Sequence, residues 1–136
     1  MNVFVSGTFD LLHSGHVTFL KNASEYGGLH VGIGSDYSVK KYKGQSPVCN
    51  QDERLFMIRA IKYVKKAWVN SGEGPFDFAE DVLKYDIDTI IVNEEQHTQE
   101  KEDFCFRESI EYIILKRDTI YGLPQRSTTK LRELCK

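Results

Sequence analysis

The sequence has little cysteine and no long apolar run, and each shortage excludes a class of protein. Its three cysteines, Cys49, Cys105 and Cys135, are scattered and form no Cys-x-x-Cys pair. An odd number of scattered cysteines predicts reduced thiols. No cysteine forms a closely spaced ligand pair with His30 or His97, which argues against a zinc site. No apolar run approaches the roughly 18 residues of a membrane span, and the first residues show no signal-peptide pattern. We therefore expect a cytoplasmic protein without membrane insertion.

The chain also lacks an excess of either charge. Its 18 Lys and Arg residues against 20 Asp and Glu residues give a net charge of −2. Such a balance gives no global field that would attract nucleic acid, so any anion binding must come from local groups. A length of 136 residues, 40% of them hydrophobic and 28% charged, is typical of one globular domain, which we expect to span 1–136.

Short apolar segments alternate with helical patterns along the chain. The strand candidates are 3–6, 30–34, 67–70, 89–92 and 112–115, and the helix candidates are 15–26, 52–64, 76–85 and 128–135. The very polar stretch 93–103 is expected to be a loop that enters a solvated helix. This alternation predicts an α/β fold with a parallel sheet, which binds ligands at the carboxyl ends of its strands.

The most informative segment runs from Gly7 to His16 and reads Gly-Thr-Phe-Asp-Leu-Leu-His-Ser-Gly-His. It joins the first strand candidate to the first helix candidate. Such a junction offers free backbone N–H groups and the positive end of a helix dipole to an anion. We expect His13 and His16, with Gly15 between them, to hold a triphosphate and to stabilise the charge that develops as pyrophosphate leaves.

Other residues of this run contribute to the predicted nucleotide site. Gly7 allows close backbone approach, Thr8 lies in the turn, and Phe9 is expected mainly to pack. Asp10 has two interpretations, because it could cap the incoming helix or contact the nucleotide or a metal on its phosphates. A carboxylate beside a triphosphate needs a bridging cation, so Mg²⁺ is expected to arrive with the nucleotide, and no separate metal site is predicted.

Two cationic segments follow at the same predicted edge of the sheet. The lysine-rich segment 35–44 is expected to be a flexible loop that binds the acceptor or the pyrophosphate, or else a solvated loop. Its candidate acceptor-binding residues are Asp36, Lys40 and Lys43, with Lys43 the favoured anion ligand. Arg54, at the start of the second helix candidate, is either a phosphate ligand or a member of a helix-surface ion pair.

A hydroxyl-rich segment near the end of the chain offers a further phosphate site. Ser127, Thr128 and Thr129 begin the last helix candidate. Their hydroxyl and amide groups could bind phosphate oxygens, cap the helix, or do both.

The run 7–16 is similar to the HxGH signature of the nucleotidyltransferase superfamily, in the longer form of its cytidylyltransferase branch. It resembles glycerol-3-phosphate cytidylyltransferases and heptose-1-phosphate nucleotidyltransferase domains. The resemblance implies a three-layer Rossmann-like fold with a five-stranded parallel sheet, and a homodimer. It implies phosphate contacts for both histidines, Arg54 and the segment 127–129, with an upstream arginine that is either Arg117 or Arg126.

One segment departs from those families. They carry a Gly-Asp pair after the fourth strand, near the base, whereas this chain reads Asn93-Glu94. An amide and a carboxylate can accept from an exocyclic amine, which cytosine and adenine both carry. The resemblance implies transfer of a cytidylyl group from CTP to a small phosphorylated acceptor such as glycerol 3-phosphate. The alternatives are an ATP-dependent enzyme for a sugar 1-phosphate and a nucleotide-binding regulator.

Overall fold

A computed structural model describes residues 1–117 and 123–135 of the chain. The strands are β1 (Asn2–Gly7), β2 (Gly28–Ile33), β3 (Val64–Val69), β4 (Thr89–Asn93) and β5 (Glu111–Leu115). The helices are α1 (Ser14–Ser24), α2 (Asp36–Lys43), α3 (Gln51–Arg59), α4 (Ala79–Lys84), α5 (Gln99–Arg107) and α6 (Thr128–Leu134). None of the helices in the described ranges is long and apolar enough to cross a bilayer.

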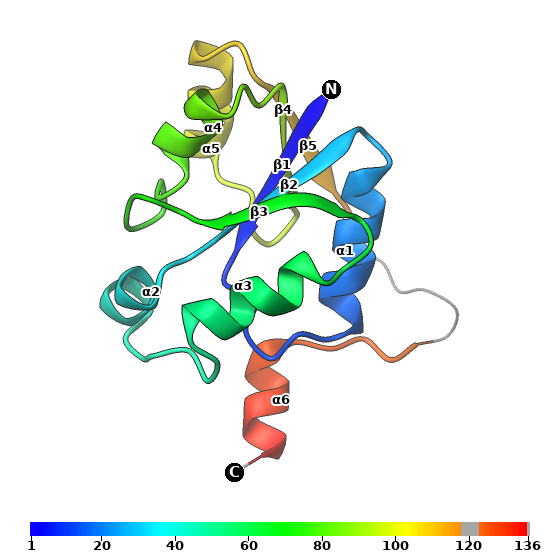
Figure 1. The fold of residues 1–136 in the computed structure, drawn as a ribbon, viewed down its shortest axis with the longest axis vertical. Coiled ribbons are helices and arrows are strands. Elements are labelled where there is room, and N and C mark those ends of the chain that lie inside the picture. The colour runs from blue at the N-terminus through cyan, green and yellow to red at the C-terminus, as the bar shows by residue number, and fades with distance from the viewer. Residues whose placement is uncertain (118–122, 136) are drawn as a thin grey trace.

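The five strands form one parallel sheet in the order β3-β2-β1-β4-β5 (Figure 1). This confirms the predicted α/β fold with a parallel sheet. The strand β1 lies at the centre, and the winding reverses between β1 and β4. Sheets of this kind open a crevice at that reversal, beyond the carboxyl ends of the two strands. The site should therefore lie after Gly7 and after Asn93.

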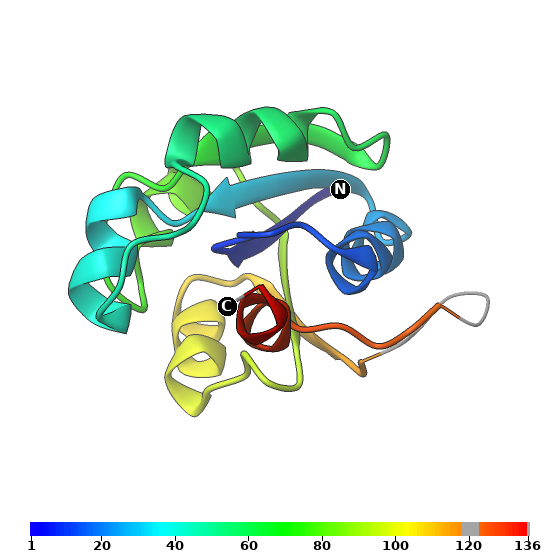
Figure 2. The same cartoon turned by 90° about the horizontal axis from the view of Figure 1, so that it is seen from below.

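Helices cover both faces of this sheet and complete three layers. Side chains alternate along β1, so that Val3 and Val5 join a cluster with Leu20 of α1 and with α3. Phe4 points to the other face, into a cluster with Phe104 of α5 and with α4. Figure 2 shows α3 above the strands and α5 below them. The two clusters fix the central strand, and with it the turn that follows.

The helix α2 is the main departure from the sequence-based prediction, which expected a flexible loop there. The Ser35 side chain accepts a hydrogen bond from the Ser38 N–H and so caps the helix. The helix ends at Gly44, whose φ of 84° lies in the left-handed region that glycine adopts readily. Both signals are present in the sequence, but the lysines between them were interpreted as a flexible cationic loop.

The bounds of the other helices and strands differ less from the sequence-based prediction. The helix α3 ends at Arg59, before the predicted end at Val64, because Val64 already begins the strand β3. The helix α4 is shorter than the predicted 76–85. The polar stretch 93–103 does lead into a helix, which begins at Gln99.

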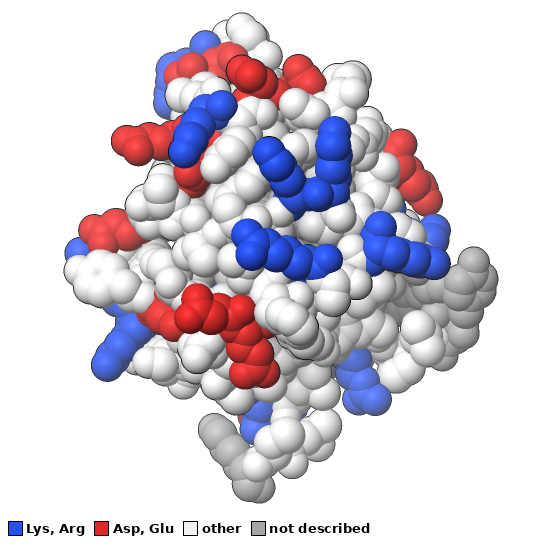
Figure 3. Space-filling model, viewed as in Figure 1, with Lys and Arg blue, Asp and Glu red and all other residues white. Residues whose placement is uncertain are grey.

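The strand β3 forms one edge of the sheet, and basic side chains surround it. Figure 3 shows lysine and arginine gathered on this face, where Lys65 and Lys66 are exposed. The Arg59 guanidinium donates to the Ala67 carbonyl at 3.1 Å and so covers part of the edge. Charged side chains on an edge strand hinder pairing with a further strand.

Candidate active site

The turn between β1 and α1 holds two residues in an uncommon conformation. Phe9 and Leu11 have φ values of 52° and 48°, which non-glycine residues rarely adopt. Phe9 is 7% exposed, and its ring meets the His16 ring edge-on at a centroid distance of 5.4 Å. A Cβ atom on Gly7 would lie 2.9 Å from the Phe9 ring, so glycine leaves room for that ring. The predicted packing role of Phe9 is confirmed, and such strain is concentrated at functional sites.

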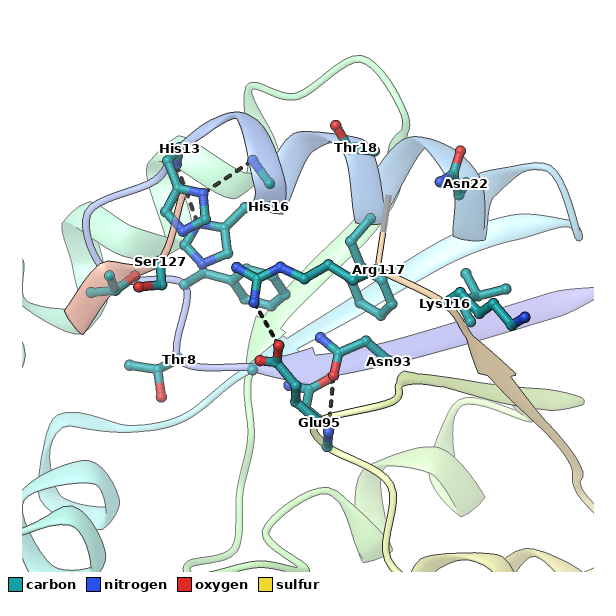
Figure 4. A pocket seen from close by; sticks show the side chains of 17 residues that line it. Thr8, His13, His16, Thr18, Asn22, Asn93, Glu95, Lys116, Arg117 and Ser127 are labelled. Carbon is teal, nitrogen blue, oxygen red and sulfur yellow. Dashed lines mark hydrogen bonds and ion pairs between the residues drawn. The ribbon is translucent and has the colours of Figure 1, made fainter. Parts of the chain in front are cut away.

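The two histidines stack on one another with ring centroids 3.8 Å apart (Figure 4). Nδ1 of His13 accepts a hydrogen bond from the Gly15 N–H at 3.0 Å, and Nδ1 of His16 accepts from the His13 N–H at 3.2 Å. This reciprocal pair is a capping box at the start of α1. An accepting Nδ1 carries no proton, so each neutral ring has its proton on Nε2.

Burial keeps both histidines neutral. Desolvation, followed by repulsion from His13, lowers the pKa of His16 to about 3. Desolvation also lowers the pKa of His13, and the positive charges of Arg117 and Arg126 add to the effect. At neutral pH the two rings therefore offer Nε2–H donors without a net charge.

A pocket of about 230 Å³ opens beside these rings, at the reversal between β1 and β4. It is lined by Gly7, Thr8, Phe9, His13, Gly15, His16, Thr18, Phe19, Asn22, Asn93, Glu95, Gln96, Leu115, Lys116, Arg117, Ser127 and Thr128. The pocket thus brings together residues predicted from three separate segments of the chain. We call it the histidine pocket.

The turn after β4 presents different residues from those predicted. Glu95 and Gln96 line the histidine pocket together with Asn93, and Glu94 does not. The Glu94 carboxylate instead accepts from the Arg117 backbone N–H at 3.3 Å. The Gln96 N–H donates to Oδ1 of Asn93 at 2.9 Å, which closes the turn. The turn therefore directs Glu95 rather than Glu94 into the pocket, and a contact of Glu94 with the base stays a prediction.

Arg117 is the upstream arginine that lines the histidine pocket. Its guanidinium pairs with Glu95 at 2.5 Å and donates to the Arg126 carbonyl at 2.5 Å. Figure 4 shows the side chain running beneath the histidine rings toward Glu95. Arg126 is not among the lining residues and acts on the site through its backbone and its charge. The geometry favours Arg117 for a phosphate contact.

Asp10 links the turn to two distant segments. Its carboxylate accepts from the backbone N–H groups of Val48 at 2.7 Å and Cys49 at 2.9 Å, and it pairs with Arg132 of α6. Burial raises the pKa of Asp10, but these hydrogen bonds together lower it. The cap interpretation is wrong, because His13 caps α1. The Asp10 carboxylate is enclosed, with the residue 2% exposed, and its contact with the nucleotide or a metal stays a prediction.

Arg54 is buried next to this turn and is 1% exposed. Its guanidinium donates to the carbonyls of Thr8 at 2.8 Å and Cys49 at 3.0 Å, and it pairs with Asp36 at 2.8 Å. The predicted ion pair on the helix surface is wrong in its placement, because Arg54 is buried where it pairs with Asp36, and the predicted phosphate contact stays a prediction. Asp36 also accepts from the Gln51 N–H at 3.1 Å, and its binding of the acceptor stays a prediction. Arg54 positions the turn through the Thr8 carbonyl.

The start of α6 closes the histidine pocket. Oγ of Ser127 accepts from the Lys130 N–H at 3.2 Å, which confirms the predicted cap, and the Thr128 hydroxyl donates to the Asp10 carbonyl at 2.9 Å. Ser127 and Thr128 line the pocket, whereas Thr129 is exposed and is not among the lining residues.

A second cavity of about 310 Å³ adjoins the histidine pocket at Gly7, Thr8 and Gln96. Its lining comprises Ser6, Gly7, Thr8, Gly34, Ser38, Val39, Tyr42, Lys43, Gly74, Pro75, Asp77, Phe78, Gln96 and Lys101. Nζ of Lys43 donates to the Thr8 hydroxyl at 2.7 Å. Lys40 and Asp36 line neither cavity, so Lys43 alone of the three predicted acceptor residues faces this space, which we call the lysine cavity.

Comparison with known proteins identifies the family. The model of cytidylyltransferase-like proteins matches residues 4–134. The chain belongs to the cytidylyltransferase-like family of nucleotidyltransferases. This confirms the resemblance carried by the run 7–16.

Three members with curated names illustrate the relationship. The chain is 29% identical to the FAD synthase of Thermococcus kodakarensis over 134 residues, which cover 96% of this chain and 89% of that protein. It is 35% identical to the FAD synthase of Methanocella paludicola, over 73% of this chain and 68% of that protein. It is 42% identical to the bifunctional protein HldE of Aliarcobacter butzleri, but this match covers 55% of the chain and only 16% of HldE.

Solved structures share the fold. The lipopolysaccharide core biosynthesis protein from Thermoplasma volcanium superposes with a TM-score of 0.72 at 25% identity, over 89% of this chain and 98% of that one. A protein of unknown function from Archaeoglobus fulgidus gives a TM-score of 0.64 at 21% identity, over 93% and 96% of the two chains. The predicted three-layer Rossmann-like fold is thereby confirmed.

Members of the cytidylyltransferase-like family are expected to use Mg²⁺ with the nucleotide. The described residues contain no group of three or more His, Cys, Asp or Glu side chains that could hold a metal. Asp10, the predicted metal partner, is enclosed by its own hydrogen bonds. The residues therefore do not form a metal site of their own. Mg²⁺ binds readily to phosphate oxygens and water, so it would be carried by the triphosphate.

Proposed function

We propose that this protein transfers a nucleotidyl group from a nucleoside triphosphate to the phosphate of a small acceptor and releases pyrophosphate. The observation that carries the proposal is the meeting of two cavities at Thr8. The histidine pocket brings two neutral ring donors to one side of this residue, and Lys43 reaches its hydroxyl from the lysine cavity. Two substrates held in the two cavities would meet at this point.

The proposed reaction needs no nucleophile from the protein. An oxygen of the acceptor phosphate attacks the α-phosphorus of the triphosphate and forms a new P–O bond. The bond from that phosphorus to the oxygen bridging to the β-phosphorus breaks, and pyrophosphate leaves with the electron pair. The protein's task is to align the two substrates and to stabilise the negative charge on the phosphate oxygens.

His13 and His16 are the proposed catalytic residues. Their backbone hydrogen bonds hold both rings in place before the substrate arrives, so no reorganisation is needed during the reaction. Their Nε2–H groups would donate to oxygens of the α- and β-phosphates. A bound triphosphate would favour the imidazolium form, which strengthens these hydrogen bonds as charge develops.

Other cationic and hydroxyl groups divide between the two substrates. We assign Arg117, Ser127 and Thr128 to the outer phosphates of the nucleotide, because they line the same pocket as the histidines. We assign Lys43 to the attacking phosphate. Burial, followed by repulsion from Arg132 and Arg54, lowers the pKa of Lys43, and an incoming phosphate would restore it.

The relatives favour ATP as the nucleotidyl donor, because FAD carries an adenylyl group and FAD synthases are among them. CTP is the second candidate, since the run 7–16 is similar to the cytidylyltransferase branch. In either case we expect the nucleobase of the bound nucleotide to lie between α1 and the ends of β4 and β5, near the amide of Asn93. The homodimer implied by the resemblance is a separate proposal, which analytical ultracentrifugation would test.

The test is pyrophosphate release with Mg²⁺, with ATP or CTP crossed against phosphorylated acceptors. We expect release with one nucleotide and one class of acceptor, and tight binding of that nucleotide alone in calorimetry. Tight nucleotide binding without release for any acceptor would instead favour a regulator. Failure of both nucleotides to bind would overturn the proposed function.

A further inference from the structure

The histidine pocket and the lysine cavity share three residues, which are Gly7, Thr8 and Gln96. Gly7 has no side chain, and the Thr8 hydroxyl already accepts a hydrogen bond from Nζ of Lys43 at 2.7 Å. Gln96 comes from a different part of the chain, the turn between β4 and α5. The proposed function gives a task to the two histidines and to Lys43, but it gives none to Gln96.

The place where the two cavities meet is also the place where the proposed reaction would occur. In phosphoryl-type transfer the attacking and leaving oxygens lie roughly in line with the phosphorus. This line would run from the lysine cavity, which receives the acceptor, into the histidine pocket, which receives the pyrophosphate. The non-bridging oxygens of the α-phosphate would then point sideways, toward the residues that both cavities share. Negative charge on these oxygens is stabilised best by hydrogen-bond donors that are already in place.

The side-chain amide of Gln96 can supply such a donor. Its Nε2 donates to the Ser6 carbonyl at 3.3 Å. A carbonyl oxygen only accepts, so this hydrogen bond fixes which end of the amide faces Ser6. A primary amide nitrogen carries two N–H groups, and the second remains available to a ligand. Because the amide has no charge, it would not repel the triphosphate, whereas the neighbouring carboxylate of Glu95 would.

The backbone of Gln96 is held at both of its hydrogen-bonding groups. Its N–H donates to Oδ1 of Asn93 at 2.9 Å, and its carbonyl accepts from Nζ of Lys101, in the first turn of α5, at 3.0 Å. Burial lowers the pKa of Lys101, and attraction to Asp77 opposes this. Gln96 is therefore positioned before a substrate binds, which is the condition for efficient stabilisation of a transition state.

We propose that Gln96 is a further catalytic residue, whose second amide N–H donates to a non-bridging oxygen of the α-phosphate, and that Lys101 positions it. This inference rests on the proposed function, because it assigns a contact with the phosphate that is transferred. A donor aimed at this oxygen acts on the transition state, so its loss should lower kcat more than it raises the nucleotide KM.

The substitution Gln96→Met tests the donor, because methionine fills a similar volume without an N–H group. The assay is pyrophosphate release with Mg²⁺ from ATP or CTP. Glycerol 3-phosphate, a hexose 1-phosphate and flavin mononucleotide are the acceptors, and the pair that wild type turns over fastest is used. We expect kcat to fall by roughly 100-fold and the nucleotide KM to change by less than about threefold.

Two further variants control for folding and for the substitution itself. Gln99→Met is the matched control, since Gln99 is exposed on α5 and lines neither cavity. Gln96→Asn is a second test, because its shorter amide stays polar but cannot reach the same oxygen, and kcat should fall here as well. Thermal unfolding of each variant checks that it is folded.

Nucleotides with sulfur on the α-phosphorus separate a contact from a structural role. Sulfur in place of one or the other non-bridging oxygen gives two diastereomers, and sulfur accepts hydrogen bonds only weakly. Sulfur at the contacted oxygen and Gln96→Met remove the same hydrogen bond, so their effects should not add. For one diastereomer, we expect the ratio of kcat with oxygen to kcat with sulfur to be roughly tenfold smaller in Gln96→Met than in wild type. For the other diastereomer the ratio should stay the same.

The positioning role of Lys101 is tested by Lys101→Met. This variant loses the donor to the Gln96 carbonyl, and we expect kcat to fall by roughly tenfold while the acceptor KM stays unchanged. The double variant with Gln96→Met should be no slower than Gln96→Met alone, because Lys101 acts through Gln96. A raised acceptor KM with normal kcat would show that Lys101 binds the acceptor and does not position Gln96.

The outcomes separate this inference from the function on which it rests. A normal kcat in Gln96→Met, or sulfur effects equal to those of wild type for both diastereomers, would overturn the assignment of Gln96 and leave nucleotidyl transfer standing. Absence of pyrophosphate release by wild type with every acceptor would overturn the proposed function, and the assignment of Gln96 with it.

Discussion

The guanidinium of Arg117 forms a 2.5 Å ion pair with the carboxylate of Glu95, and both side chains line the histidine pocket (Figure 4). The side chains are 37% and 66% exposed, so water screens the pair and its contribution to stability is small. A triphosphate would compete with Glu95 for the guanidinium, because arginine binds phosphate through two parallel hydrogen bonds. The ion pair would therefore oppose the binding of a triphosphate in this pocket.

We predict that Glu95→Gln tightens nucleotide binding. Removal of the negative charge frees Arg117 and reduces repulsion of the triphosphate, and we expect a gain of roughly three- to tenfold in affinity at low salt. Calorimetry without an acceptor measures this directly. Glu94→Gln is the matched control, because Glu94 lies next in sequence but outside the histidine pocket. Weaker binding by Glu95→Gln would mean that the carboxylate contacts the nucleotide.

The proposed catalytic role of His16 predicts different effects for two amide substitutions. Asn can replace Nδ1 as the acceptor for the His13 N–H, but it has no donor at the position of Nε2. We therefore expect His16→Asn to remain folded and to lose roughly 100-fold in kcat. His16→Gln, whose longer amide can reach the Nε2 position, should retain more activity. Equal activity of wild type and His16→Asn would exclude the donor role.

The neutral histidines predict how stability depends on pH. The folded-state pKa of His16, about 3, lies below its ordinary value of 6.5, so between these values the unfolded chain binds a proton that the folded chain does not. The contribution is complete above pH 6.5 and is lost as the pH falls toward 3, with a slope of at most about 1.4 kcal/mol per pH unit. Urea denaturation across this range measures it. His16→Asn should flatten the profile, and an unchanged profile would show that the pKa of His16 is the same in the folded and the unfolded protein.

Local patterns predicted most of the fold, because short apolar segments alternate with helical patterns along the chain. The placement of His13 and His16 at the start of α1 could also be predicted, since they lie in one contiguous run with Gly15. The direction of the Glu95 side chain, which faces the histidine pocket, could not be predicted, because it depends on the turn that Asn93 closes. Asp77 and Lys101 were missed for a similar reason, since only the packing of α5 brings them to one cavity.

The burial of Arg54 could not be predicted from the sequence either, because it depends on contacts with Thr8 and Asp36, which lie 46 and 18 positions away in the chain. We predict that Arg54→Met destabilises the protein by on the order of 3 kcal/mol, since it leaves buried hydrogen-bond acceptors unpaired. Chemical denaturation measures the loss, and the exposed Arg107→Met is the control. Because Arg54 holds the Thr8 carbonyl, kcat should fall while the nucleotide KM changes little. Normal stability with a raised nucleotide KM would support Arg54 as a phosphate ligand.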